Sequence, residues 1–442
     1  MKKCKIGFIS LGCPKNQVDT EVMLKELMDA GYELTGEDIE ADIIIVNTCA
    51  FIDSAKKESI DNILDVAWLK KNGKLKGIIV CGCMAERYRE EILAEMPEVD
   101  AVLGVGSLHS IVAAVEAVAK GKKGYTCFDD KDSMPLGGER VVTTAEHTAY
   151  LKIAEGCDNR CTYCAIPSIR GKFRSRTIED IVAEAKTLEE IGVKELVLVA
   201  QDTTRYGEDL YGGYKLPELV RAICDATAIP WIRLLYCYPD KITDELIEEF
   251  KQNDRLLNYI DIPIQHISAK VLKRMNRHGG AAAVRDAISK LRGVEGMVLR
   301  TTAIVGFPGE SEEDFTELCE FIKETKFDRF GVFTYSKEEG TPAAEFEDQI
   351  DEQVKQDRMD NIMELQLTIN EELNEKKVGS VIKVLCEGFD PVSEAYYGRS
   401  YADAPDIDGK MYFTGSKGIK EGSFVMVKVT EVLDYDLVGE TK

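Results

Sequence analysis

Residues 155–164 read EGCDNRCTYC and place three cysteines in a C-x3-C-x2-C loop. The loop directly follows an apolar, strand-like stretch at 149–154. Three thiolates on a short loop can hold three corners of a cubane iron–sulfur cluster, because thiolate is the ligand that such clusters take. A fourth cysteine would give an electron carrier, whereas three leave one iron open to bind and activate a small molecule. We therefore predict a 4Fe-4S cluster on Cys157, Cys161 and Cys164.

Two other interpretations of this loop are a three-cysteine zinc site completed by a distant histidine, and buried structural cysteines. A closed zinc site normally brings its fourth ligand on a nearby knuckle. The chain has only four histidines, and none flanks the loop. The spacing therefore favours the iron–sulfur cluster.

With Tyr163 just before its third cysteine, the loop resembles the signature of the radical S-adenosylmethionine enzymes. The resemblance implies that the open iron binds the amino and carboxylate groups of S-adenosylmethionine. It also implies that the reduced cluster cleaves this molecule to a 5'-deoxyadenosyl radical, which abstracts a hydrogen from the substrate. Tyr163 would then lie against the adenosine.

The composition indicates a multidomain protein of the cytoplasm. At 442 residues the chain is long enough for two or three domains with separate cores. No apolar run approaches the length of a membrane span, and the apolar stretch after the basic start is too short for a good signal peptide. The thirteen cysteines are an odd number, which favours a reducing compartment and metal ligation over disulfides.

The net charge of -23 disfavours nonspecific binding to nucleic acid. Neutralisation of phosphates by lysine and arginine is the main source of such affinity. A basic protein is the partner that this charge would attract.

Residues 1–118 predict a Rossmann-like domain with a parallel sheet. Apolar runs at 5–11, 43–46, 77–80 and 101–105 alternate with amphipathic stretches, as in sheets with crossover helices. Three of these strands end in a cysteine, and the carboxyl ends of parallel strands meet at one edge. We predict a second cluster with an open corner, held by Cys13, Cys49 and Cys83. The alternatives are Cys81 in place of Cys83, and cysteines that act only as small buried apolar residues.

After an aperiodic linker at 119–142, residues 143–374 predict an open (β/α)6 partial barrel. Six strands alternate with helices, and the loops at the strand carboxyl ends of such folds build the active site. The cluster loop follows the first strand, so polar or glycine-bearing turns after other strands are expected to contact S-adenosylmethionine. An ordinary tight turn is the alternative for the glycines, and His266 fits a structural role better than a catalytic one. These expected cofactor contacts are Gln201, Gly306, Pro308 and Gly309.

The remaining residues, 375–442, contain short strands separated by glycine and aspartate. They predict a small five-stranded β-barrel of the oligonucleotide-binding type. A charged stretch at 345–376 with apolar residues at helical spacing is expected to join this barrel to the preceding domain. The complete prediction is an α/β multidomain protein.

Together the three segments resemble the methylthiotransferase family, which combines an amino-terminal three-cysteine domain, a radical S-adenosylmethionine core and a terminal TRAM barrel. The resemblance implies that the cluster on Cys157, Cys161 and Cys164 makes the radical. It also implies that the cluster on Cys13, Cys49 and Cys83 carries the sulfur. One molecule of S-adenosylmethionine methylates this sulfur, and a second molecule gives the radical. A methylthio group then replaces a C-H bond, and a donor such as flavodoxin or ferredoxin supplies electrons.

Two substrates divide this family: adenosine in transfer RNA, and the β-carbon of an aspartate in the twelfth small-subunit ribosomal protein. Residues 376–442 contain 9 Lys and Arg against 11 Asp and Glu, a balance of -2, whereas a barrel that grips RNA should be basic. The run at 397–409 also resembles the ribosomal-protein branch. We expect Asp403, Asp406 and Asp408 to attract a basic ribosomal loop, with a solvated acidic turn as the alternative.

Three other functions are disfavoured by these features. Transfer RNA as substrate is the alternative within the family. An electron carrier or iron–sulfur scaffold would gain from full cysteine ligation, and the acidic terminal barrel argues against a plain RNA-binding module.

Overall fold

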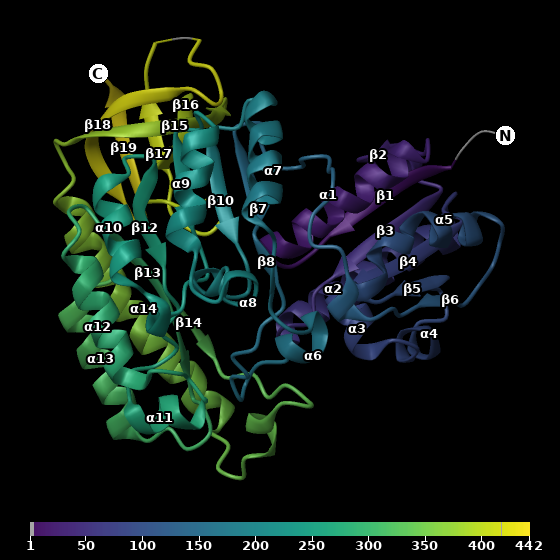
Figure 1. The fold of residues 1–442 in the computed structure, drawn as a ribbon, viewed down its shortest axis with the longest axis horizontal. Helices are drawn as coiled ribbons and strands as arrows, with labels where there is room; N and C mark the ends of the chain where they lie inside the picture. Colours follow the sequence, from purple (N-terminus) through teal and green to yellow (C-terminus); the bar gives the residue numbers. More distant parts are fainter. Residues whose placement is uncertain (1–3, 417) are drawn as a thin grey trace.

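The computed structural model describes residues 4–416 and 418–442. Figure 1 shows three bodies, with the amino-terminal domain in purple and blue, a central domain in teal and green, and a small barrel in yellow. The amino-terminal domain and the barrel both lie against the central domain. No helix in the described ranges combines the length and apolar character needed to cross a bilayer.

The amino-terminal domain contains a parallel sheet in the order β2-β1-β3-β4-β5-β6. Every residue of β3 and β4 is buried, which is typical of parallel strands covered on both faces. The strands are β1 (Lys5–Ser10), β2 (Glu33–Thr35), β3 (Ile43–Thr48), β4 (Gly77–Gly82), β5 (Ala101–Leu103) and β6 (Tyr125–Cys127). The helices are α1 (Pro14–Asp29), α2 (Asp53–Asn72), α3 (Cys83–Tyr88), α4 (Glu91–Glu95) and α5 (Ile111–Ala119).

This sheet has two strands that the sequence analysis missed. Both β2 and β6 are three residues long, which is too short for a clear apolar pattern. Strand β6 lies within 119–142, the segment expected to be a linker, and it pairs with β5 at the edge of the sheet. The segment is therefore partly structured, because backbone pairing rather than apolar periodicity holds its strand.

The central domain contains an open sheet of six parallel strands in the order β14-β13-β12-β11-β10-β7, which confirms the predicted (β/α)6 architecture. The strands are β7 (Thr148–Lys152), β10 (Glu195–Val199), β11 (Trp231–Leu234), β12 (Leu256–Asp261), β13 (Val298–Val305) and β14 (Arg329–Thr334). A short pair, β8 (Ala154–Glu155) and β9 (Arg174–Ser175), follows β7. The helices are α6 (Ile166–Arg170), α7 (Ile178–Glu190), α8 (Glu208–Tyr211), α9 (Leu216–Ala226), α10 (Asp244–Gln252), α11 (Ala269–Arg274), α12 (Gly280–Arg292), α13 (Glu312–Thr325) and α14 (Glu352–Glu375).

The terminal domain is a closed barrel in the order β15-β16-β17-β19-β18, as predicted. Its core contains Val384, Cys386, Met411, Phe413 and Val427. The strands are β15 (Val381–Asp390), β16 (Ala395–Ser400), β17 (Met411–Thr414), β18 (Phe424–Leu433) and β19 (Asp436–Thr441).

A turn of the terminal barrel covers the inner face of the central sheet. Along β10, Leu196 packs with the helix-side core, whereas Val197 packs in a second cluster with Ala402 and Ala404 of the turn. Alternation of side chains along a strand separates these two clusters. The barrel is therefore seated on the face of the sheet opposite the helices.

Two of the three aspartates expected on an acidic surface are buried in this contact. Asp403 pairs with Arg329, and Asp408 pairs with Arg300 and accepts a 2.6 Å hydrogen bond from Tyr259. Their side chains are 8% and 2% exposed. The expectation that they attract a partner is therefore wrong for this arrangement, because each neutralises a cation of the central domain.

We predict that Asp403→Asn weakens the seating of the terminal barrel. The change leaves the Arg329 guanidinium without its buried counter-charge, which costs about 3 kcal/mol. Thermal unfolding and limited proteolysis should both show the loss, and Asp434→Asn, an exposed position of the same barrel, is the matched control. Equal unfolding temperatures for the two variants would contradict the structural role of Asp403.

Candidate functional site

The loop that carries Cys157 is pinned at both ends. At its start, Gly156 has a φ of +78°, and a Cβ there would lie 2.0 Å from the carbonyl oxygen of Lys172. Only glycine permits this close approach. At its other end, Thr162 donates a 3.0 Å backbone hydrogen bond to Met275. Contacts within the central domain therefore hold both ends of the loop.

Hydrogen-bond donors surround two thiols of this loop. Asn159 Nδ2 lies 3.5 Å from the Sγ of Cys157, and the hydroxyl of Tyr238 lies 3.0 Å from the Sγ of Cys161. Arg277 packs on the ring of Tyr238, and its guanidinium is 4.0 Å from the same Sγ of Cys161. Donors to ligand sulfurs tune the reduction potential of a cluster. The sequence analysis assigned no role to Asn159 or Arg277.

The chemistry of this donor set fits an iron–sulfur cluster. Burial raises the pKa of Cys157 to about 11 and also raises the pKa of Cys164. These thiols are therefore neutral unless a strong positive centre stabilises their thiolates. The irons of a cubane supply such a centre, and the surrounding donors satisfy the sulfurs.

The structure brings the cysteines at the strand ends together. Cys13 caps the amino end of α1, Cys49 follows β3, and Cys83 is the first residue of α3. A Cβ on Gly12 would lie 2.8 Å from the Cβ of Cys49, so the turn before Cys13 touches Cys49 directly. The charges of Cys13 and Cys49 also act on the pKa of Cys83. This is the edge of the sheet where open α/β folds bind ligands.

The rival ligand, Cys81, lies inside strand β4. It is fully buried, and its backbone pairs with Asn47 on one side and Leu103 on the other. Cys83 lies two residues later at the strand end, and Arg170 donates to its Sγ from 3.4 Å. This placement supports Cys83 as the third ligand.

Two positive charges act on this second group of thiols. Burial raises the pKa of Cys13, but the charges of Lys15 and Arg170, together with backbone hydrogen bonds from Lys15 and Asn16, outweigh burial and lower the pKa below the ordinary value. Burial dominates at Cys83 and raises its pKa to about 12. The thiol of Cys13 is therefore easier to ionise than the thiol of Cys83. A bound cluster would favour the thiolate form of both.

A buried charge cluster connects the amino-terminal and central domains. Arg170, at the end of the helix that follows the cysteine loop, donates to Asp19 at 2.6 Å and to Glu155 at 3.2 Å. Lys152 binds the same two carboxylates. Arg170 also donates to the side-chain oxygen of Asn16. We call Asp19, Lys152, Glu155 and Arg170 the buried charge cluster.

Gln201, an expected cofactor contact, extends this cluster. Its Nε2 donates to Glu155 at 2.7 Å, which fixes the side-chain amide. Its buried Oε1 has no hydrogen-bond partner within the described residues. A buried acceptor without a partner is costly, so this oxygen is suited to a donor on a bound molecule.

The turn that contains Gly306 and Gly309, which was expected to contact the cofactor, packs closely against other residues of the chain. A Cβ at Gly306 would lie 2.2 Å from the Cγ of Lys355, and one at Gly309 would lie 2.4 Å from the Oδ2 of Asp348. Both glycines have positive φ. These contacts fit the alternative of an ordinary tight turn, and Pro308 lies between the two glycines in the same turn.

Tyr163 and His266 both have packed surroundings in the structure. Tyr163 packs beside a cluster that contains Phe307 and Tyr335. His266 is buried, and burial lowers its pKa to about 4. Its Nδ1 accepts a 2.9 Å hydrogen bond from the amide of Ser268, which supports a structural role for this histidine.

A cavity of about 340 Å³ lies where the three bodies meet. Cys13 opens onto it, and Tyr236, which forms part of its wall, has a φ of +60° that is rare for a residue other than glycine. The ammonium of Lys15 lies 3.3 Å from the centre of the Tyr236 ring. The lining residues include Gly12, Gln17, Thr143, Tyr150, Leu235, Asp406 and Ile407. We call this space the junction cavity.

Comparison with known families divides the chain as the fold does. Residues 5–104 match the uncharacterized protein family UPF0004, residues 151–322 match the radical SAM superfamily, and residues 378–441 match the TRAM domain. A solved radical S-adenosylmethionine methyltransferase, TsrM from Kitasatospora setae, covers 77% of each chain with a TM-score of 0.54 and 13% identity. The radical enzyme OxsB covers 83% of this chain and 58% of its own, with a TM-score of 0.51 and 14% identity. These likenesses concern the fold.

Curated relatives match along the whole chain. The ribosomal protein uS12 methylthiotransferase RimO of Acetivibrio thermocellus is 52% identical over 100% of this chain and 98% of its own. The protein of the same name from Clostridium perfringens is 53% identical over 99% and 98%. That from Thermoanaerobacter is 49% identical over 98% and 99%.

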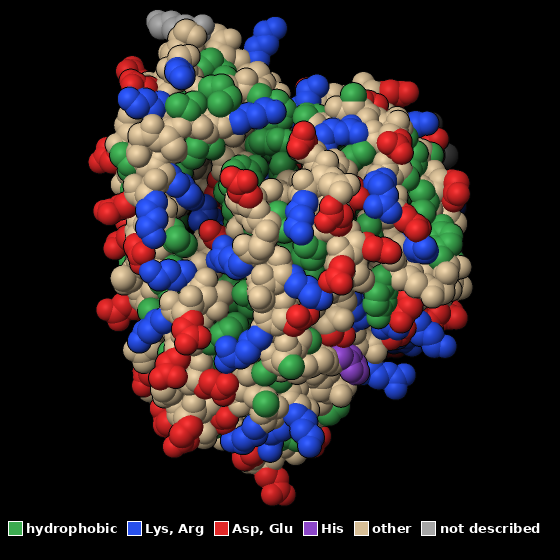
Figure 2. Space-filling model, turned by 60° about the vertical axis from the view of Figure 1, so that its left-hand side comes forward, with side chains coloured by type: hydrophobic (Ala, Val, Ile, Leu, Met, Phe, Trp, Pro, Cys, Tyr) green, Lys and Arg blue, Asp and Glu red, His purple; other side chains and the backbone are tan. Residues whose placement is uncertain are grey.

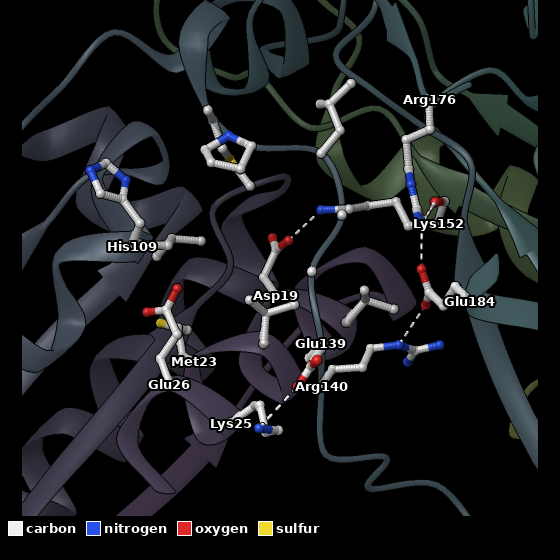
Figure 3. A pocket seen from close by; sticks show the side chains of 18 of the residues that line it. Asp19, Met23, Lys25, Glu26, His109, Glu139, Arg140, Lys152, Arg176 and Glu184 are labelled. Carbon is white, nitrogen blue, oxygen red and sulfur yellow. Dashed lines mark hydrogen bonds and ion pairs between the residues drawn. The ribbon is translucent and has the colours of Figure 1, made fainter. Parts of the chain in front are cut away.

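A larger cavity, of about 400 Å³, lies between α1 and residues 134–140. Figure 3 shows Asp19 and Glu26 on α1, with His109 on one side of them and Lys152 reaching Asp19 from the other. The buried Oε2 of Glu26 has no hydrogen-bond partner within the described residues. Burial consequently raises the pKa of Glu26 from 4.5 to about 7.

We predict that Glu26 makes the fold less stable as the pH rises from 4.5 to 7. The folded chain binds this proton more tightly than the unfolded chain, so stability is lost when the proton leaves. Glu26→Gln should therefore stabilise the protein at pH 8 by on the order of 1 kcal/mol, a value reduced by solvent screening, and have little effect at pH 5. Thermal unfolding at both pH values checks this, with Glu58→Gln on exposed α2 as control. An equal gain at both pH values would contradict it.

Proposed function

The chain belongs to the family of ribosomal protein uS12 methylthiotransferases named RimO, and we propose that it acts on an aspartate of that ribosomal protein. The reaction replaces a C-H bond at the β-carbon of the aspartate with a methylthio group, with two 4Fe-4S clusters and S-adenosylmethionine as cofactors. The observation that carries the proposal is the junction at which buried ion pairs join the two domains that carry the cysteine triplets. Arg170 spans that junction, since it follows one triplet in sequence and touches Cys83 of the other.

We propose the following roles for the residues of the chain. Cys157, Cys161 and Cys164 hold the cluster that cleaves S-adenosylmethionine, and Cys13, Cys49 and Cys83 hold the cluster that carries sulfur. When bound, these groups supply a radical that breaks an unactivated C-H bond and a sulfur that replaces the hydrogen.

Several neighbouring residues fix the geometry and the charge around these ligands. Asn159 and Tyr238 donate to ligand sulfurs, and the free Oε1 of Gln201 is suited to a donor on S-adenosylmethionine. Tyr163 remains a proposed adenosine contact. For Gly306, Pro308 and Gly309, the packing of the turn on Lys355 and Asp348 favours a supporting role over direct contact.

We propose that the ribosomal loop enters the junction cavity. Asp406, the third acidic residue expected to bind substrate, is exposed and forms part of the wall together with Cys13. Tyr150 donates to it at 3.3 Å. Asp403 and Asp408 hold the turn in place by their ion pairs, so Asp406 is the carboxylate of this turn that can meet a basic loop. The acceptor sulfur and the substrate would then share one space.

The charge of the protein supports a protein substrate over transfer RNA. Figure 2 shows acidic and basic side chains interspersed over the face that it draws, without one broad basic patch. The net charge of -23 further disfavours phosphate binding. An acidic protein and a basic ribosomal loop attract each other.

We also propose a cytoplasmic location and a one-electron donor of the flavodoxin or ferredoxin type. All thirteen cysteines are free, as in proteins of reducing compartments. Reductive cleavage of S-adenosylmethionine requires an electron, and the chain must receive it from another protein.

We place the radical core at 143–374 and the terminal domain at 375–442.

We predict that the two cysteine triplets fail in different ways. The reconstituted chain should contain about eight irons. Replacement of Cys157, Cys161 and Cys164 by Ala should leave about four irons and abolish cleavage of S-adenosylmethionine. Replacement of Cys13, Cys49 and Cys83 should preserve cleavage to 5'-deoxyadenosine but abolish methylthiolation of uS12. Iron analysis and product chromatography measure these outcomes.

The matched control for this experiment is Cys81→Ser, which should retain about eight irons. Loss of the second cluster in that variant would show that the wrong thiolate was chosen. Normal methylthiolation by the variant without Cys13, Cys49 and Cys83 would show that this triplet is not the sulfur site.

We predict that Asp406→Asn lowers kcat/KM for uS12 roughly two- to fivefold, the range of an exposed charge pair. The effect should shrink as salt rises, because exposed charges are screened over about 8 Å at physiological ionic strength. Asp434→Asn removes the same charge from the far turn of the barrel and should have no effect. If Asp406→Asn instead improves methylthiolation of transfer RNA and uS12 stays unmodified, the substrate assignment is wrong.

A further inference from the structure

Arg170 is bound on all sides by groups that belong to two domains. Its guanidinium is 2% exposed and donates to Asp19, Glu155 and Asn16. The remaining contact is the Sγ of Cys83, at 3.4 Å. Through this contact, the helix that follows the cysteine loop at 157–164 touches Cys83, one of the three cysteines at the strand ends.

The charges around Arg170 balance without the thiol. Two cations, Arg170 and Lys152, face two carboxylates, Asp19 and Glu155, and all four side chains are buried. The carboxylates therefore already neutralise the guanidinium. Its hydrogen bond to Cys83 adds a donor, directed at one sulfur, to a group whose net charge is zero.

The position of Arg170 is held by both polypeptide segments that carry cysteine ligands. It ends α6, which begins two residues after Cys164. Its partners Asn16 and Asp19 lie on α1, the helix that Cys13 caps. A shift of either segment would break this set of contacts, so the distance from the guanidinium to Cys83 is fixed.

We propose that Arg170 is a positioning residue that raises the reduction potential of the cluster held by Cys13, Cys49 and Cys83. This inference rests on the proposed function, which places that cluster there. A hydrogen-bond donor directed at a ligand sulfur stabilises the reduced, more negative form of a cluster. Arg170 belongs to a helix of the central domain, so it would act across the junction on the cluster of the amino-terminal domain.

The test measures the potential of the second cluster alone. In a background with Cys157, Cys161 and Cys164 changed to Ala, the reconstituted protein is titrated with dithionite and followed by electron paramagnetic resonance. Each reduction adds one electron to the cluster, without a proton and without a broken bond. No substrate and no S-adenosylmethionine are needed.

The informative variant is Arg170→Met with Asp19→Asn. This pair removes one cation and one carboxylate, so Lys152 and Glu155 remain as a balanced pair. The matched control is Lys152→Met with Asp19→Asn, which removes the same number of charges but keeps the contact from Arg170 to Cys83. We expect the potential to become more negative in the first variant and to stay unchanged in the control.

An unchanged or more positive potential in the Arg170 variant, with about four irons bound, would overturn the proposal and leave the proposed function intact. Absence of iron from the parent background would overturn both. If the double variant fails to load iron, Arg170→Lys serves instead, because it keeps the charge and loses the planar fork. It should shift the potential in the same direction by less, and no shift would overturn the proposal.

Discussion

The arrangement of the whole site depends on a desolvated charge cluster at the junction of two domains. Asp19 comes from the amino-terminal domain, and Lys152, Glu155 and Arg170 come from the central domain. Buried charges are tolerated only when they are paired, and removal of one partner is strongly destabilising. The two domains therefore favour one relative arrangement, the one in which Lys152 and Arg170 both pair with Asp19 and Glu155. That arrangement places the helix capped by Cys13 beside the helix that follows Cys164.

Buried ion pairs also hold the terminal barrel against the central domain. Glu195, in the first position of β10, binds Arg233 of the central domain and Arg399 of the barrel. The pair of Arg329 and Asp403 holds the following turn. Because this turn covers the inner face of the sheet, Asp406 is carried to the edge of the junction cavity. Three domains thus contribute to one space, although none of them contains it alone.

The three-domain architecture was predictable from the sequence because its signals are local, and local signals also led to the two proposed groups of cysteine ligands. Ligand spacing identifies the loop at 157–164, and strand ends identify Cys13, Cys49 and Cys83. The buried charge cluster could not be predicted, since charged residues are usually solvated and these partners lie far apart in sequence. Asp403 and Asp408 were misplaced for the same reason, as their arginine partners belong to other strands.

The central claim is that the two cysteine triplets hold clusters that face each other across this junction. The most direct measurement is electron paramagnetic resonance of the fully loaded, reduced protein, compared with the two variants that each lack one triplet. Unpaired electrons on neighbouring clusters interact, so the spectrum of the intact protein should be broadened or split relative to the sum of the two variant spectra. A spectrum that equals this sum would contradict the claim.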